Sequence, residues 1–168
     1  MHELTIRAAM GDNGTMPRDR TAVDVSLLLM RVIVGIIFVA HGAQKLFGAF
    51  GGPGLAEIVK MMGPIGYLVT IGEFFGGLGL IAGFLCRFSA ASLMVIMIGA
   101  IAMVHGQHGF FLGHGPESTL ATAGYEYNLA LIGLLAPILI AGPGRFAIGR
   151  SLPLPKSSRT GRLIVVLE

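Results

Sequence analysis

Residues 31–47 read RVIVGIIFVAHGAQKLF, and this stretch decides the fold class of the chain. It is almost entirely apolar, and a helix that crosses a bilayer needs about 20 such residues. It nevertheless carries three basic residues, Arg31, His41 and Lys45. A charged side chain that faces lipid costs a few kcal/mol, so we expect these three to face other protein segments. The stretch therefore predicts a membrane helix packed in a bundle.

Composition extends this prediction to the whole chain. Of its 168 residues, 54% are hydrophobic and only 12% are charged, with a mean hydropathy of +0.78. Soluble domains carry about 25% charged residues, so the composition indicates an integral membrane protein. No segment resembles a nucleic-acid-binding module. The single cysteine, Cys86, excludes an intramolecular disulfide and a thiolate-rich metal site.

Four apolar segments are long enough, or nearly so, to cross the membrane. We expect spans at about 25–47, 63–84, 88–104 and 124–141, with loops rich in Gly, Pro and Ser at 48–62 and 105–123. The connection between the second and third spans is so short that they should be adjacent and antiparallel. The predicted fold is an all-α, polytopic four-helix bundle over residues 23–142, because helices satisfy their own backbone hydrogen bonds in lipid. Residues 1–22 and 143–168 are expected to be tails.

The distribution of Lys and Arg predicts the orientation of the bundle. One side collects nine basic residues, and the other has Lys60, joined by Lys45 at a helix end. We therefore expect both termini to be cytoplasmic, with the basic C-terminal tail lying along the anionic inner surface of the membrane. The nine are Arg7, Arg18, Arg20, Arg87, Arg145, Arg150, Lys156, Arg159 and Arg162.

Helical geometry gathers the intramembrane charges on inward faces. At about 100° per residue, the face of Arg31 also carries Gly35, Phe38, Gly42 and Lys45, with His41 at its edge. Two acids lie on other spans.

Glu73 sits mid-membrane on a face with Gly66, Thr70 and Gly77, and Glu126 begins the fourth span. From the rise of about 1.5 Å per residue, we expect Lys45 to pair with Glu126, and Glu73 to pair with His41 or Arg31. These pairs could simply fix helix register, or they could line a polar chamber in the outer half that binds a quinone head group, a proton or a small solute.

Several motifs together resemble the DoxX family of small four-helix membrane proteins. They are GIIFVAHGAQKLFGAFGG at 35–52, GEFFGGLGLIAGFLCR at 72–87, GFFL at 109–112, GYEYNLALIG at 124–133 and GPGRFAIGR at 142–150. The resemblance implies a four-helix bundle in the bacterial inner membrane and an association with quinone-linked redox complexes. It points to Arg31, His41, Lys45, Glu73, Arg87, Tyr125 and Glu126 as functional residues.

The outer loop contains three histidines, His105, His108 and His114. Imidazole groups bind zinc or copper when they converge, but the spacing of these three matches no closed site. His41 and His105 could also provide a pair of axial haem ligands. The alternative is a water-exposed, glycine-rich loop.

Three classes of function follow from these patterns. The first is a quinone-binding membrane subunit of a redox complex, in which Glu73 and Glu126 transfer protons, Tyr125 donates a hydrogen bond, and a peripheral redox protein supplies electrons. Such a chain would be a subunit rather than a complete enzyme. The second is a non-catalytic membrane anchor or assembly factor. The third is a small-solute transporter, for which four helices would be few unless the chain formed a homo-oligomer.

Overall fold

The computed structural model describes residues 20–113 and 123–151, and these residues form helices and no strands. The all-α prediction is therefore confirmed for the described part of the chain. In order, the elements are α2 (Arg20–Phe47), the 3-10 turn η1 (Ala49–Gly51), α3 (Gly54–Met62), α4 (Ile65–Ala82), α5 (Cys86–Ala100), the π-helical turn η2 (Ile101–His105), the 3-10 turn η3 (Gly106–His108), α6 (Glu126–Ala141) and α7 (Ile148–Ser151).

Three helical segments among the described residues are long and apolar enough to cross a membrane. They are α2, α4 and the continuous segment Cys86–His108 that joins α5 to η2 and η3. The fourth predicted span corresponds to α6, which is apolar but has only 16 residues. At about 1.5 Å per residue it is roughly 24 Å long, shorter than a hydrocarbon core of about 30 Å. The structure supports a polytopic helical membrane protein, and the crossing by α6 stays a prediction.

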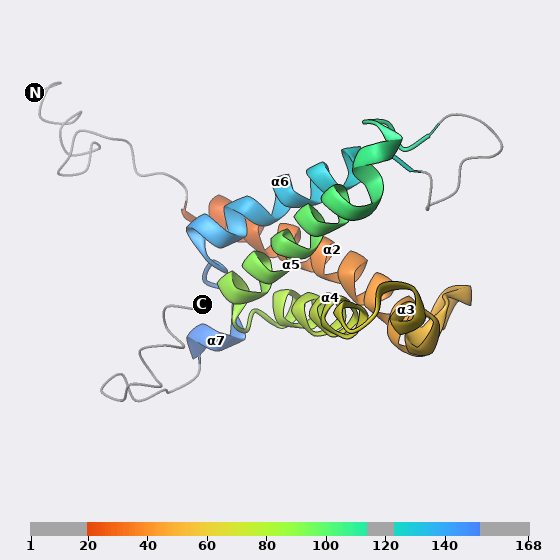
Figure 1. Ribbon diagram of the computed structural model, residues 1–168. Helices are drawn as coiled ribbons and strands as arrows, with labels where there is room; N and C mark the ends of the chain where they lie inside the picture. The colour runs from red at the N-terminus through yellow and green to blue at the C-terminus, as the bar shows by residue number, and fades with distance from the viewer. Residues whose placement is uncertain (1–19, 114–122, 152–168) are drawn as a thin grey trace, which may run out of the picture.

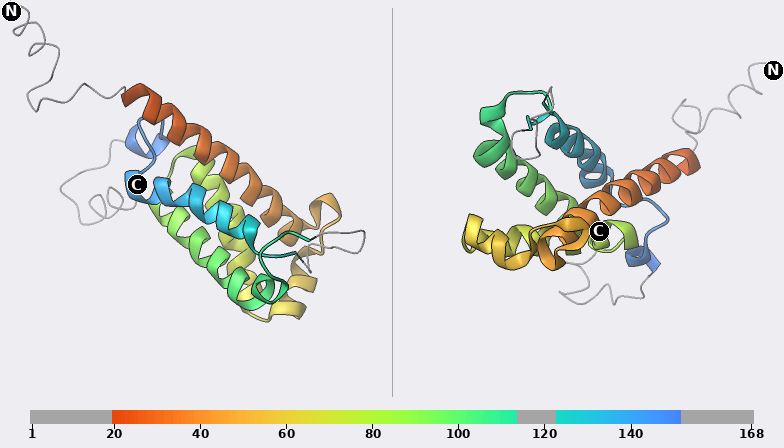
Figure 2. Two further views of the ribbon diagram at one scale, coloured as in Figure 1. Left: turned by 90° about the horizontal axis from the view of Figure 1, so that it is seen from above. Right: turned by 90° about the vertical axis from the view of Figure 1, so that its right-hand side faces the viewer.

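The four long helices pack into one bundle (Figures 1 and 2). α2 makes its most extensive contact with α4, α5 packs against both α4 and α6, and α2 also touches α6. The predicted antiparallel neighbours, α4 and α5, are joined by a tight turn at residues 83–85. The buried core comes from all four helices and includes Val34, Phe38, Leu80, Leu93 and Leu135.

Glycines allow α2 and α4 to approach backbone to backbone. A β-carbon added at Gly42 would lie 2.5 Å from the amide nitrogen of Phe74, and one added at Gly77 would lie 2.8 Å from the carbonyl oxygen of Gly35. Separations this short exclude any side chain at these positions, since real contacts between carbon atoms lie near 3.5–4.0 Å. The predicted inward face of α2 is confirmed, because Arg31, Gly35 and Gly42 are all buried.

The first connection differs from the expected loop. Residues 48–62 were predicted to lack helix because of their glycines and proline, but 54–62 form α3. Pro53 precedes the helix, where a missing amide hydrogen does no harm, and Gly63 ends it with a positive φ of 65°. Ile58 is buried against the bundle. Pro53 and Gly63 mark the two ends of α3. The short amphipathic segment between them is helical, although the glycine and proline content of the whole stretch predicts a loop.

Candidate functional site

A cavity of about 540 Å³ lies inside the half of the bundle that carries α3. Its volume is within the range of about 300–1,000 Å³ that small-molecule sites occupy. Most of its wall is apolar, with contributions from α2, α3, α4, α5 and α6. The polar residues on this wall are His41, Gln44, Lys45, Glu73, His105, Tyr127 and Asn128.

An ion pair between Lys45 on α2 and Glu73 on α4 forms the charged part of this wall. The Lys45 Nζ donates to the Glu73 Oε2. The Glu73 side chain is 5% exposed and that of Lys45 is 22% exposed, so the carboxylate is the more deeply buried partner. The close approach at Gly42, one turn before Lys45, sets the two helices near enough for this contact.

This pairing corrects two predictions. Lys45 was expected to meet Glu126, and Glu73 was expected to meet His41 or Arg31, because depth along each helix was the only guide. The structure pairs Lys45 with Glu73 instead. Depth estimates locate a residue along the bundle axis, but they do not say which helices are neighbours at that depth.

His41 lies one turn before Lys45 and faces α6. Its ring centroid is 6.4 Å from that of Tyr127, with the two planes tilted by 54°. Both residues line the cavity. The imidazole therefore lies in the same wall as the ion pair, with an aromatic neighbour on the opposite helix.

His105 is held in the cavity wall by a backbone contact. Its Nδ1 is 2.8 Å from the carbonyl oxygen of Ala123, at the beginning of the segment that leads into α6. A carbonyl oxygen can only accept, so Nδ1 must carry the hydrogen, which leaves Nε2 of a neutral ring as an acceptor. His105 ends η2, a π-helical turn of a kind that is frequent at functional sites. The ring is thus fixed in one orientation at the edge of the cavity.

A paired strap borders one end of the cavity. The amides of Gly124, Tyr125 and Glu126 donate to the carbonyls of Phe111, Gly109 and Phe110 at 2.9, 3.1 and 2.9 Å. Leu112, Ala123 and Gly124 from this strap, residues 109–112 and 123–126, line the cavity.

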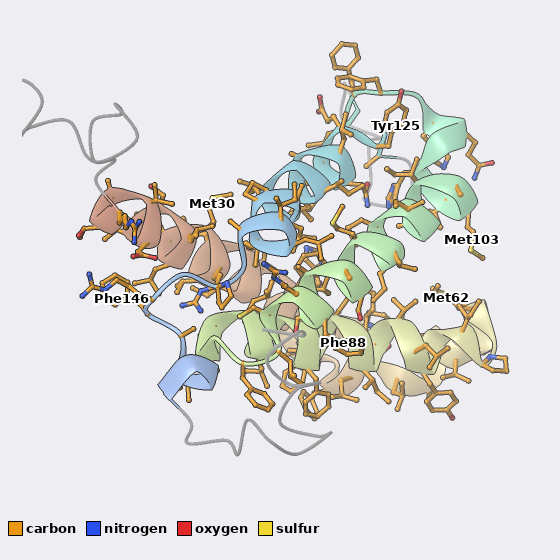
Figure 3. The ribbon with its side chains drawn as sticks, turned by 90° about the vertical axis from the view of Figure 1, so that its left-hand side faces the viewer. Met30, Met62, Phe88, Met103, Tyr125 and Phe146 are labelled. Atoms are coloured by element: carbon orange, nitrogen blue, oxygen red, sulfur yellow. The ribbon has the colours of Figure 1, made fainter. Side chains whose placement is uncertain are left out.

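The strap also shows where Glu126 and Tyr125 lie. The Glu126 Oε1 accepts the amide of Leu112 at 2.8 Å, and the Tyr125 ring packs edge-on against Phe110 at 5.4 Å. Neither residue lines the cavity. Figure 3 shows Tyr125 on the strap. Glu126 thus holds the strap together at the beginning of α6.

Arg31 lies near the opposite end of the bundle, away from the cavity. It is fully buried, and its Nη2 donates to the carbonyl oxygen of Phe146 at 2.7 Å. Its Nη1 lies close to Gly83, at the C-terminal end of α4, where the helix dipole favours a cation. Among residues 20–113 and 123–151, Arg31 forms no ion pair. The side chain ties the GPGRF segment onto the bundle; Figure 3 shows Phe146 at this end and Met62 and Met103 at the other.

Arg87 belongs to the same end. Its Nη2 donates to the carbonyl oxygen of Ile140 at 3.1 Å, close to the last turn of α6. Nearby, the amide of Arg145 donates to the Asp24 Oδ1 at 2.9 Å. These contacts fasten α2, α5 and α6 together, so Arg87 and Arg145 serve packing in the structure.

The histidines of the outer loop do not converge with other metal-binding groups in the described part of the chain. No group of three His, Cys, Asp or Glu residues that could hold a metal occurs there. His108 is exposed in η3, and His114 falls outside the described residues.

Sequence reasoning missed three polar wall residues, Gln44, Tyr127 and Asn128. Asn128 is buried, with its Nδ2 3.4 Å from the Met97 Sδ. A lone amide on an otherwise apolar helix is costly to bury, and that signal could have identified it. Because Asn128 is uncharged, an argument from charged residues does not identify it.

Comparisons with known proteins agree with the sequence motifs. Residues 26–106 match the family model DoxX. The Escherichia coli (strain K12) inner membrane protein YqjF is 29% identical over 129 residues, which cover 77% of this chain and 93% of YqjF. CatD of Bacillus subtilis (strain 168), named provisionally as an oxidoreductase, is 32% identical over 87 residues, which cover 48% of this chain and 60% of CatD. No solved structure matches.

Proposed function

Starting from the DoxX domain that spans residues 26–106, we propose that this chain is a quinone-binding membrane subunit of a redox complex. The observation that carries the proposal is the cavity of about 540 Å³, whose mainly apolar wall holds the Lys45–Glu73 ion pair and His41. The similarity to YqjF, an inner membrane protein, supports a bacterial inner-membrane location. CatD, with its provisional oxidoreductase name, is consistent with redox chemistry.

The groups in the cavity fit the chemistry of a quinone head. A quinone ring is flat and apolar on its faces and carries two carbonyl oxygens that accept hydrogen bonds. The apolar walls suit the ring, and the Lys45 ammonium is a donor on the cavity wall. Asn128 has an amide group on α6 at the same cavity. Polar groups on α2 and α6 can therefore orient a ring between them, as expected of a mostly apolar site with a few fixed polar groups.

Two residues are placed to handle protons. A bound quinone accepts two electrons and two protons to become a hydroquinone. Glu73, when protonated, can donate from its buried oxygen, and Lys45 stabilises the carboxylate that results. His41 lies one turn before Lys45 on the same wall, and an imidazole group can both accept and donate a proton. We assign proton delivery to Glu73 and His41.

The proposal includes a peripheral redox protein that supplies the electrons, and a four-span topology with both termini in the cytoplasm. Basic residues support this orientation, because Arg20 begins α2, Arg87 is in the first turn of α5 and Arg145 follows α6. These helix ends lie at the end of the bundle opposite α3 (Figure 1). The cavity then lies in the periplasmic half of the bilayer. Lipid surrounds the apolar outer faces of the helices.

The first experiment measures quinone bound to the detergent-purified protein. The lipid extract is assayed for quinone, and a reduced-minus-oxidised spectrum is recorded from ultraviolet to visible. We expect near-stoichiometric quinone from the wild-type protein and a marked loss of turnover with its partner in Glu73→Gln. Glu57→Gln is the matched control, because Glu57 forms an exposed pair with Lys60 at 3.7 Å.

Other outcomes would contradict the proposal. Quinone at only the level of bulk lipid, with unchanged turnover in Glu73→Gln, would exclude a quinone site at this cavity. Loss of partner binding alone would indicate an anchor or assembly factor, and loss of solute uptake alone would indicate a transporter.

A further inference from the structure

We propose that the cavity opens sideways into the bilayer through a mouth between α4 and α5, and that the tail of a long-chain amphiphile extends through it. The mouth is defined by Ile65 and Leu68 on α4, Val95 and Gly99 on α5, and Met103 on η2. The identity of the head group as a quinone rests on the function proposed above, but the mouth itself rests on the packing of α4 and α5.

These two helices touch over only part of their length. From the turn at residues 83–85 they stay close, because a β-carbon at Gly79 would lie 2.6 Å from the Ser89 Oγ and one at Gly72 would lie 2.7 Å from the Ile96 Cδ1. One turn beyond Ile96, a β-carbon at Gly99 would meet nothing within 4 Å. The open space at Gly99, a residue of the cavity wall, agrees with a separation of the two helices past the contact of Gly72 with Ile96.

The figures show the same separation. The beginning of α4 and the whole of α3 diverge from the end of α5 (Figure 2, right). Met62 and Met103, which lie on the two sides of this gap in Figure 3, both line the cavity. The cavity wall therefore includes residues from both α3 and η2.

Apolar side chains form the rim and are exposed. Leu68 is 71% exposed, Val95 69% and Met103 65%, and all three also line the cavity. A residue that both lines a cavity and is exposed lies at its opening. An opening into water with such a rim would expose apolar surface, whereas an opening into lipid leaves these side chains in a medium that suits them.

The depth of the rim agrees with an opening into hydrocarbon. Gly99 is 13 residues from Cys86, at the beginning of an apolar segment of 23 residues. At about 1.5 Å per residue, it lies roughly 20 Å along a segment of roughly 35 Å. The mouth is thus inside a bilayer whose hydrocarbon core is about 30 Å thick.

Three of the polar groups lie on different helices from the mouth, while Glu73 lies further along α4 than the rim and His105 ends η2. Lys45 and His41 are on α2 and Asn128 is on α6, whereas the rim belongs to α4, α5 and η2. A ligand with its polar head at α2 and α6 would extend its tail toward the rim. The tail could then stay in lipid while the head reaches the ion pair, without crossing water.

Two glycines provide a matched pair of variants. Gly99 and Gly133 both have open space where a β-carbon would be, and both are inside helices. Gly99 lines the cavity and Gly133, on α6, does not. Gly99→Leu therefore places a side chain in the mouth, and Gly133→Leu adds the same side chain elsewhere.

The test measures binding of two probes to the purified protein in nanodiscs. One probe is a dimethoxy-methyl-benzoquinone with a ten-carbon tail, and the other is the same quinone with hydrogen in place of the tail. We expect Gly99→Leu to weaken binding of the tailed probe about tenfold, the effect of one overpacked contact, and to leave the tail-less probe unchanged. Gly133→Leu should affect neither.

If Gly99→Leu weakens binding of both probes equally, or weakens binding of neither, the proposal of a mouth between α4 and α5 is wrong. If Gly99→Leu does not accumulate, Leu68→Trp on the opposite rim makes the same comparison.

A second measurement separates the mouth from the quinone proposal. Native mass spectrometry of the detergent-purified protein should show one retained long-chain molecule in the wild type and in Gly133→Leu, and none in Gly99→Leu. A retained phospholipid in place of quinone, lost in Gly99→Leu, would refute the quinone function and uphold the mouth. If all three proteins retain the long-chain molecule equally, or if none retains it, the proposal of a mouth between α4 and α5 is wrong.

Discussion

The ion pair between Lys45 and Glu73 provides the sharpest quantitative prediction. Removing one partner of a buried pair leaves an uncompensated charge and costs about 3–5 kcal/mol. Glu73 is only 5% exposed, whereas Lys45 is 22% exposed. Lys45→Met, which strands the deeper charge, should therefore destabilise the protein more than Glu73→Gln, because a stranded Lys45 ammonium can reach polar surroundings at the end of its flexible stem.

The size of the effect can be stated as a melting temperature. For a chain of 150–250 residues, 1 kcal/mol shifts Tm by roughly 2–4 °C. A loss of about 3 kcal/mol in Lys45→Met should then lower Tm by about 6–12 °C. The double variant Lys45→Met/Glu73→Gln carries no stranded charge, so most of this loss should be recovered.

Cys86 provides the probe for measuring these melting temperatures. It is the only cysteine in the sequence and is fully buried, so a thiol-reactive fluorophore labels the protein only as it unfolds. Lys60→Met serves as the control. Lys60 and Glu57 are 77% and 56% exposed, and an exposed pair contributes at most about 1 kcal/mol.

Two results would refute this reasoning. The first is a Tm for both single variants equal to that of Lys60→Met. This would mean that the Lys45–Glu73 pair contributes no more to stability than the exposed Lys60–Glu57 pair. The second is a double variant whose loss equals the sum of the single losses, because two residues in direct contact should not behave additively.

Two further predictions concern the parts that frame the cavity. Gly42→Ala should lower Tm by about 2–12 °C, because the added carbon would lie 2.5 Å from the Phe74 amide nitrogen and overpacking costs about 1–3 kcal/mol. Gly133→Ala, with open space around it, should leave Tm unchanged. Equal effects of the two substitutions would contradict the close approach of α2 and α4. Glu126→Ala should speed hydrogen exchange at the Leu112 amide about fivefold, since that amide loses an acceptor and a hydrogen bond contributes about 1 kcal/mol. Glu126→Gln keeps the acceptor and should exchange like the wild type, so a Gln variant as fast as Ala would show that the charge of Glu126 matters.

Local patterns in the sequence predicted the helices and their inward faces. The apolar runs located α2, α4 and α5, and the 3.6-residue period placed Arg31 and Glu73 on buried faces, as the structure confirms. Hydropathy and periodicity are properties of one segment, so they can be evaluated without its neighbours. The same reasoning missed α3, because its glycines and proline dominate a segment in which only Ile58 is buried.

The candidate site was only partly accessible to such reasoning. His41, Lys45 and Glu73 were expected in a shared polar interior, and all three line the cavity. Glu126 and Tyr125 were expected beside them, but the structure places both in the strap. Position along a helix fixes depth and face, whereas the identity of the facing helix depends on packing.

The sequence by itself determined that this protein is a helical membrane protein and that Arg31 and Glu73 lie on buried helix faces, because a charged side chain is costly in lipid. Only the tertiary structure decided that Lys45 meets Glu73 and that a cavity lies beside them. Those outcomes depend on the close approach of α2 and α4 at Gly42 and on the separation of α4 from α5 beyond Gly72. Both are relations between residues distant in the chain, set by side-chain volume at helix crossings, and no single segment encodes them.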